Sequence, residues 1–137
     1  MEKTISSFLS IVLLIVLLIG CKNKNASEAH LQERVKAFYD LLKHERFENS
    51  WDYLMEVSKK SWIKDRWVMF WLGVSKKSKM LDYHLGPMRI EKNNKSTSAR
   101  VKVVLKVLDL SSNEIYSSDH ESEWAFENGE WFRFEDI

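Results

Sequence analysis

The spacing of apolar residues changes near Met80, and this change most constrains the fold. Residues 97–110 alternate between the two faces of an extended chain, with apolar side chains at Val101, Val103, Leu105 and Val107. Alternation with period two over so long a stretch indicates a β-strand that buries one face. Before Met80, apolar residues instead recur every three or four positions. The sequence therefore predicts helices followed by strands, which is the α+β class.

Three further extended segments are predicted at residues 80–92, 114–127 and 130–136. Gly86-Pro87 interrupts the first of these segments and predicts a bulge, because proline cannot donate to a strand ladder. Asn128-Gly129 is the preferred dipeptide of a type I′ turn and predicts a hairpin between the last two segments. We therefore expect a four-stranded antiparallel meander.

Three N-terminal helices are expected to pack on this curved meander. The first follows Ser27, a residue suited to an N-cap, and carries Leu31, Val35, Phe38, Leu41 and Leu42 on one face. The second has one face made by Phe47, Trp51, Leu54 and Met55. Residues 67–72 are continuously apolar and fit either a buried helical turn or a strand. We favour a third helix over residues 61–74 that ends at Gly73.

The N-terminal segment carries a separate signal. The chain has 137 residues and one cysteine, which leaves room for a single domain and for no internal disulfide. Residues 8–19 are apolar except for one serine, a run too short for a spanning helix of about 20 residues. Leu18-Ile19-Gly20-Cys21 follows, and then a polar stretch.

This arrangement closely resembles the lipobox of bacterial lipoprotein signal peptides. The resemblance implies a signal peptide over residues 1–20, a tether over 21–26 and a folded domain over 27–137. It also implies that Cys21 carries acyl chains, which hold the protein on the outer side of the bacterial cell membrane or on the outer membrane. A short single-pass helix and an ordinary secretory signal are the alternatives. On the lipoprotein interpretation, Cys21 takes part in neither catalysis nor metal binding.

The order of elements is similar to that of the NTF2-like, or cystatin-like cone, superfamily. The residues that carry the likeness are Val35–Tyr39 with Phe47–Leu54, and Trp124–Trp131 at the closing hairpin. The resemblance implies helices that close one side of a bent sheet and leave a cone. In that superfamily the cone is a ligand pocket, an active site or a filled core, and the fold alone does not choose among them.

Five residues are candidates to line a ligand site in such a cone: Trp67, Trp71, Tyr83, His120 and Trp124. The tryptophans fit a core equally well, since aromatic residues at helical spacing usually serve packing. His120 also has the chemistry of a general base. No local pattern assigns a catalytic residue, and the four histidines lack the spacing of metal ligands. We therefore expect no cofactor.

The predicted hairpin also gives a candidate interface. A two-residue turn pairs Phe126 with Trp131 and Trp124 with Arg133, so Phe132 and Phe134 lie on the opposite, outer face. A homodimer or a protein partner could cover this outer face. The alternative is that Phe132 or Phe134 packs within the monomer.

The net charge of +1 conceals two segments of opposite sign. Residues 59–79 hold seven basic residues against one acid, and residues 109–137 hold nine acids against one base. Cross-strand pairs of Lys102 and Lys106 with acids explain part of this pattern. The basic segment also suits anionic lipid headgroups, and the acidic segment suits a partner. Nucleic acid is excluded as a partner, because the chain is expected to be exported and has no net basic domain.

The sequence thus predicts a lipid-anchored extracytoplasmic binding or accessory domain. It would recognise a small apolar ligand in the cone or a protein partner on the sheet. A small enzyme of the isomerase or hydrolase type and a structural envelope lipoprotein are the alternatives.

Overall fold

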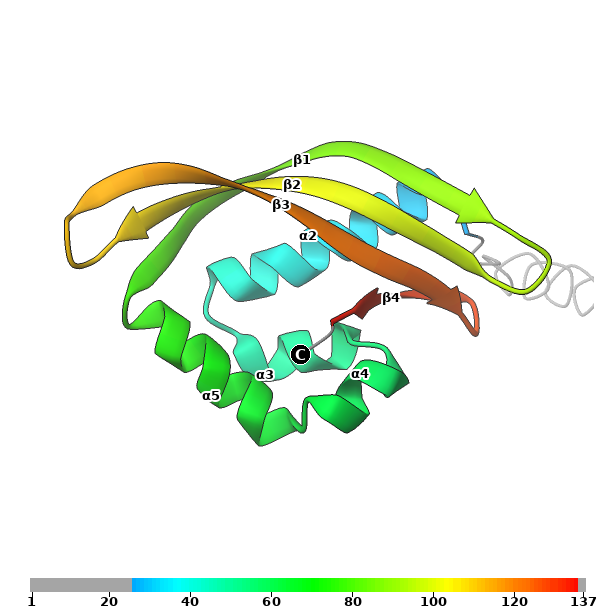
Figure 1. The fold of residues 1–137 in the computed structure, drawn as a ribbon, viewed down its shortest axis with the longest axis horizontal. Helices are drawn as coiled ribbons and strands as arrows, with labels where there is room; N and C mark the ends of the chain where they lie inside the picture. Colours follow the sequence, from blue (N-terminus) through cyan, green and yellow to red (C-terminus); the bar gives the residue numbers. More distant parts are fainter. Residues whose placement is uncertain (1–25, 136–137) are drawn as a thin grey trace, which may run out of the picture.

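Four antiparallel strands form one curved sheet in the order β1-β2-β3-β4 (Figure 1). The strands are β1 (Ser78–Lys92), β2 (Thr97–Asp109), β3 (Glu114–Glu127) and β4 (Glu130–Phe134). The structure is a computed structural model that describes residues 26–135. The expected four-stranded meander is confirmed, and with the helices it gives the α+β class.

Within residues 26–135, four α-helices and a 3-10 helix precede the sheet, where the sequence predicted three helices. They are α2 (Glu28–Lys43), α3 (Phe47–Ser50), η1 (Trp51–Tyr53), α4 (Glu56–Ser61) and α5 (Lys64–Ser75). The predicted second helix is broken because Leu54 is extended and forms an isolated parallel bridge with Arg133 of β4. Residues 67–72 lie within α5, which confirms the helical interpretation. The helix ends at Ser75, so the predicted end at Gly73 is wrong.

The turns and the register follow the predictions from sequence. Ser27 caps α2 by accepting the backbone N–H of His30 at 3.2 Å. The register of β1 against β2 shifts between Leu85 and Met88, which is the bulge expected at Gly86-Pro87. Asn128 and Gly129 have φ angles of 52° and 80°, as a type I′ turn requires. The predicted pairs of the closing hairpin are all present.

The core lies between α2 and the concave face of the sheet (Figure 1). The helix contributes one buried stripe, and the strands contribute the side chains of alternate positions. The fully buried members include Leu31, Val35, Phe38, Val101, Val103, Trp124 and Trp131. Burying each large apolar side chain stabilises the fold by about 1.5–3 kcal/mol, so this cluster holds the helix on the sheet.

The predicted signal peptide, the tether up to Asn25 and the lipidation residue Cys21 lie outside the described residues. Within residues 26–135, none of the helices combines the length and the apolar character that crossing a bilayer demands.

Candidate functional site

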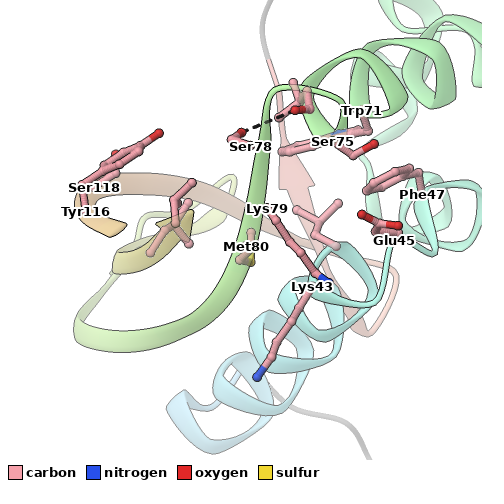
Figure 2. Close-up of a pocket in the computed structure, with 14 residues that line it drawn as sticks. Lys43, Glu45, Phe47, Trp71, Ser75, Ser78, Lys79, Met80, Tyr116 and Ser118 are labelled. Carbon is pink, nitrogen blue, oxygen red and sulfur yellow. Dashed lines mark hydrogen bonds between the residues drawn. The ribbon is translucent and has the colours of Figure 1, made fainter. Parts of the chain in front are cut away.

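An apolar cleft opens where α5 joins β1, beside the C-terminal end of α2 (Figure 2). Its volume is about 200 Å³. Eight apolar or aromatic side chains line it, and they come from helices and strands alike: Leu42, Phe47, Trp71, Val74, Met80, Leu105, Val107 and Tyr116. Six polar residues complete the lining: Lys43, Glu45, Ser75, Ser78, Lys79 and Ser118.

The cleft exists because the sheet is longer than the helix that covers it. The 16 residues of α2 extend over about 24 Å, whereas the 13 residues of β2 extend over about 43 Å. The inner positions near the C-terminal end of β2 therefore reach past the last turn of α2. Leu105 and Val107 occupy these positions, opposite Ser118 and Tyr116 of β3. They form the sheet side of the cleft.

The helix side of the cleft is built from aromatic packing. Trp71 and Val74 are three positions apart on α5 and line the cleft together. The Trp71 ring stacks on Phe47 with a centroid distance of 6.0 Å and an interplanar angle of 19°. Phe47 is itself buried and also lines the cleft, so the two stacked rings form one continuous aromatic wall. A rigid aromatic surface of this kind suits an apolar ligand.

Several polar groups at the rim are already engaged. Lys43 forms an ion pair with Asp82 at 3.1 Å. The Ser75 and Ser78 hydroxyls donate to helix carbonyls of α5 at 3.0 and 3.4 Å. Within the described part of the chain, the Lys79 ammonium has no hydrogen-bond or ion-pair partner. It is therefore available to a ligand at the mouth of the cleft.

Of the five predicted ligand-site residues, only Trp71 lines this cleft. Trp67 and Trp124 are each 1% exposed and belong to the core. Their indole N–H groups donate to Ser50 and Ser122 hydroxyls, both at 3.0 Å. Both tryptophans are members of the core cluster, which agrees with the core interpretation.

Tyr83 lies on a shallower groove beside α2. Its hydroxyl donates to the Asp40 carboxylate at 2.7 Å and contacts the Lys36 carbonyl at 3.1 Å. Burial and, after it, the Asp40 carboxylate raise the pKa of the Tyr83 phenol. The phenol therefore stays protonated at neutral pH and holds β1 against α2.

His120 belongs to a buried network centred on Arg133, which the sequence reasoning missed. Arg133 is 5% exposed. Its guanidinium meets the Glu135 carboxylate at 2.6 Å, the Tyr39 hydroxyl at 2.9 Å and His120 Nε2 at 3.0 Å. It also lies 4.8 Å from the centre of the Phe38 ring. The sequence did carry a signal for this network, because Arg133 is a charged residue at a position of β4 that faces inward.

The protonation state of His120 follows from this contact. A guanidinium only donates, so Nε2 of His120 accepts and the ring proton is on Nδ1. Burial and the neighbouring Arg133 charge lower the pKa of His120. Its basic nitrogen is thus occupied by Arg133, and the residue does not line the cleft. In this arrangement His120 positions Arg133 and has no lone pair free for proton abstraction.

The outer face of the sheet is mostly charged. Lys102 pairs with Asp119 at 3.0 Å, as the cross-strand interpretation predicted, whereas Lys106 lies opposite Ser117 of β3. Phe132 is half-buried, with the Arg34 guanidinium 5.7 Å from its ring centre. Phe134 is 36% exposed. The predicted interface at Phe132 and Phe134 therefore stays a prediction, with Phe132 partly covered by its own chain.

We next compared the lining of the cleft with what acid catalysis or metal binding would require. Glu45 is the one carboxylate among the residues that line the cleft, and no histidine lines it. Within residues 26–135, no three His, Cys, Asp or Glu side chains are grouped as a metal site requires. The lining is mainly apolar and aromatic, which suits an apolar molecule.

Comparison with solved structures identifies the fold. A SEC-C motif containing protein from Rhodopseudomonas palustris matches with a TM-score of 0.58 and 12% identity, over 74% of this chain and 73% of that chain. A structure described as an NTF2-like transpeptidase from Campylobacter jejuni matches with a TM-score of 0.53 and 15% identity, over 80% of this chain and 100% of that chain.

A third structure, from Catenulispora acidiphila, has a TM-score of 0.56 and 8% identity, over 77% of this chain and 84% of that chain. No protein-family model matches the sequence, and no curated protein matches it. Together these findings show an NTF2-like fold, as the order of elements predicted. At sequence identities this low, the matches show a shared fold but not a shared activity.

Proposed function

We propose that this chain is a lipid-anchored extracytoplasmic binding domain whose cleft takes a small apolar ligand. The observation that carries the proposal is the cleft itself, about 200 Å³ of space lined chiefly by apolar and aromatic side chains. Concave apolar sites with a few polar groups at the rim are the usual form of a ligand site. The alternatives were a small enzyme and a structural envelope protein.

The position of the cleft is consistent with an anchor at the N-terminus. The described chain starts toward the same end of the long axis as the turn between β1 and β2 (Figure 1). The cleft lies toward the other end, where α5 meets β1 and where β2 turns into β3 (Figure 1). A tether at Cys21 would therefore leave the cleft directed away from the membrane. This geometry supports a site that samples the extracytoplasmic space.

The polar groups near the cleft favour recognition over chemistry. Lys43 is paired with Asp82, and the basic nitrogen of His120 is occupied by Arg133. Lys79 lines the cleft without a partner among the described residues, but it is exposed at the mouth. A reaction would require a base or nucleophile that is free and aimed at the ligand. Burying about 150 Å² of ligand surface contributes about 4 kcal/mol, which corresponds to a Kd near 1 mM. The expected affinity for a small apolar probe is therefore modest.

Two measurements test the two parts of the proposal. Metabolic labelling with a fatty acid should label the wild-type chain and fail for Cys21→Ser, and label retained by that variant would refute the anchor. For the cleft, the full chain in a neutral detergent is titrated with benzyl alcohol, and the indole N–H signals are followed by NMR. The Trp71 signal should shift, whereas the buried Trp124 signal should stay in place.

A matched pair of variants separates the cleft from general surface binding. Val74→Phe fills the cleft, and Val104→Phe makes the same change at a half-buried position on the outer face of β2. The first variant should abolish the Trp71 shift, and the second should preserve it. If both variants respond as the wild type does, the cleft is not the binding site.

A further inference from the structure

The strand β3 extends well beyond its neighbour β4. Only Glu123–Glu127 of β3 pairs with β4, whereas residues 114–126 pair with β2 on the other side of the strand. Within the described residues, the edge of β3 from residue 114 to residue 121 has no strand beside it (Figure 1). We call residues 114–121 the open edge. An unpaired strand edge of this length is a template for a further strand.

The amides of the open edge alternate in direction. In an antiparallel ladder, neighbouring residues direct their backbone N–H and C=O groups to opposite edges of the strand. The two-residue turn at Asn128-Gly129 makes Glu127 and Glu130 a hydrogen-bonded pair, so odd-numbered residues of β3 face β4. By the same alternation, Ser117 and Asp119 direct their amides to the open edge.

The side chains of the open edge differ between the two faces of the sheet. On the inner face, Tyr116 and Ser118 line the apolar cleft. On the outer face, Asp119 and Glu121 give the edge a negative charge, and both are exposed. A strand added here would place alternate side chains in the cleft and the others beside two carboxylates.

The chain already shows which kind of strand β3 accepts. On its paired side β3 lies against β2, whose outer face carries Arg100, Lys102 and Lys106 and whose inner face carries Val101, Val103 and Leu105. Lys102 lies opposite Glu121 and forms an ion pair with Asp119. On the side of β3 that faces away from β2, the open edge presents the carboxylates of Asp119 and Glu121 on the outer face and the side chains of Tyr116 and Ser118 on the inner face. A strand that alternates basic and apolar residues therefore fits both sides of β3.

We propose that the open edge binds an extended peptide segment of a protein partner, with basic residues on the outer face and apolar residues directed into the cleft. The proposal rests on the proposed function insofar as the partner would use the same cleft. A second copy of β3 is a poor occupant, because pairing two open edges would bring Asp119 and Glu121 close to their own counterparts. Backbone pairing supplies the affinity, and the two alternating rows supply the specificity.

The test uses a labelled peptide of known sequence and the full chain in a neutral detergent. The probe is TSARVKVVLKVLD, which is the sequence of β2, and its binding is followed by fluorescence polarisation. Ser117→Pro removes one N–H from the open edge and leaves the pairing with β2 intact, whereas Ser117→Ala is the matched control. We expect the proline variant to weaken binding about tenfold and the alanine variant to bind as the wild type does.

Charge reversal gives a second, independent test. Glu121→Lys should weaken binding of this peptide about tenfold and should strengthen binding of a version in which each Lys and Arg is replaced by Glu. Equal binding of both peptides by the wild type would overturn the proposal. So would unchanged binding by Ser117→Pro, once its urea unfolding midpoint shows that it folds.

The remaining outcomes separate this proposal from the others. If benzyl alcohol shifts Trp71 but the peptide does not bind, the cleft site stands and the open-edge proposal fails. If the peptide binds without any Trp71 response to benzyl alcohol, the small-ligand proposal fails and the open edge stands. If sedimentation shows a dimer that Ser117→Pro dissociates, and no peptide binds, a second copy occupies the edge and the proposal is wrong.

Discussion

Replacing Arg133 by methionine should remove the polar network that joins three parts of the chain. Arg133 lies on β4 and contacts Tyr39 of α2, His120 of β3 and the Glu135 carboxylate. Methionine keeps much of the apolar stem and removes every donor. The substitution thus isolates the contribution of the guanidinium from that of packing volume.

The expected loss is about 3 kcal/mol of unfolding free energy. The Tyr39 hydroxyl belongs to a residue that is 1% exposed, so losing its donor costs about 1–2 kcal/mol. Contact with the Phe38 ring contributes about 1 kcal/mol more. The Glu135 side chain is 27% exposed and regains water, so its lost pair adds less than a fully buried one would. A loss of this size lowers the thermal midpoint by about 12 °C.

Urea unfolding followed by tryptophan fluorescence measures this change. Arg34→Met is the control, because the Arg34 side chain is more exposed, at 21%. It donates to the Trp131 carbonyl at 3.0 Å, lies 3.7 Å from the Glu130 carboxylate and 3.8 Å from the centre of the Tyr53 ring. Counting the hydrogen bond and the ring contact on the same scale, we expect about 2 kcal/mol for that variant. If Arg133→Met loses no more than Arg34→Met, the buried network does not stabilise the fold as its geometry implies.

Three further results follow from the same contacts. Burial and the Arg133 charge hold the pKa of His120 below its ordinary value of 6.5, so the unfolded chain binds this proton more readily than the folded chain does. The free energy of unfolding should therefore fall as the pH drops through 6.5. In urea titrations at several pH values, His120→Gln should reduce this dependence of stability on pH. Ser50→Ala leaves the buried Trp67 indole N–H without its acceptor and should cost about 1.5 kcal/mol in the same assay, whereas no loss would show that water replaces the hydroxyl. In a series of n-alkanols, affinity read from the Trp71 signal should rise with chain length, since each buried CH₂ group contributes about 0.8 kcal/mol, and should level off once the cleft is filled. A rise that continues undiminished to decanol would show that the cleft does not limit the size of the apolar group.

The sheet could be predicted from sequence because its signals are local. Alternation along residues 97–110 fixes which face of β2 is buried, and the Asn128-Gly129 turn fixes the register of the last hairpin. The helices were harder, because the second predicted helix is broken by a contact far along the chain. Leu54 is extended where it bridges Arg133, and helical spacing carries no information about such a partner.

The cleft depends on lengths and faces that only the folded chain brings together. Trp67 and Trp71 are four positions apart on α5, yet Trp67 is buried in the core and Trp71 lines the cleft. Both residues fit the same helical face in the sequence. Which of them lines the cleft is decided by where α2 ends relative to β2, and that is a tertiary property.

Along the inner row of β3, the Arg133 network lies between the buried core and the residues that line the cleft. Along the inner row of β3, Trp124 and Ser122 are buried in the core, His120 follows, and Ser118 and Tyr116 line the cleft. A ligand that entered deeper than Ser118 would have to displace the His120 contact and strip a buried guanidinium of its partners. That cost, several kcal/mol, exceeds what a few additional CH₂ groups return. The network does not line the cleft, but its position beyond Ser118 limits how far an apolar group could extend along β3 toward the core.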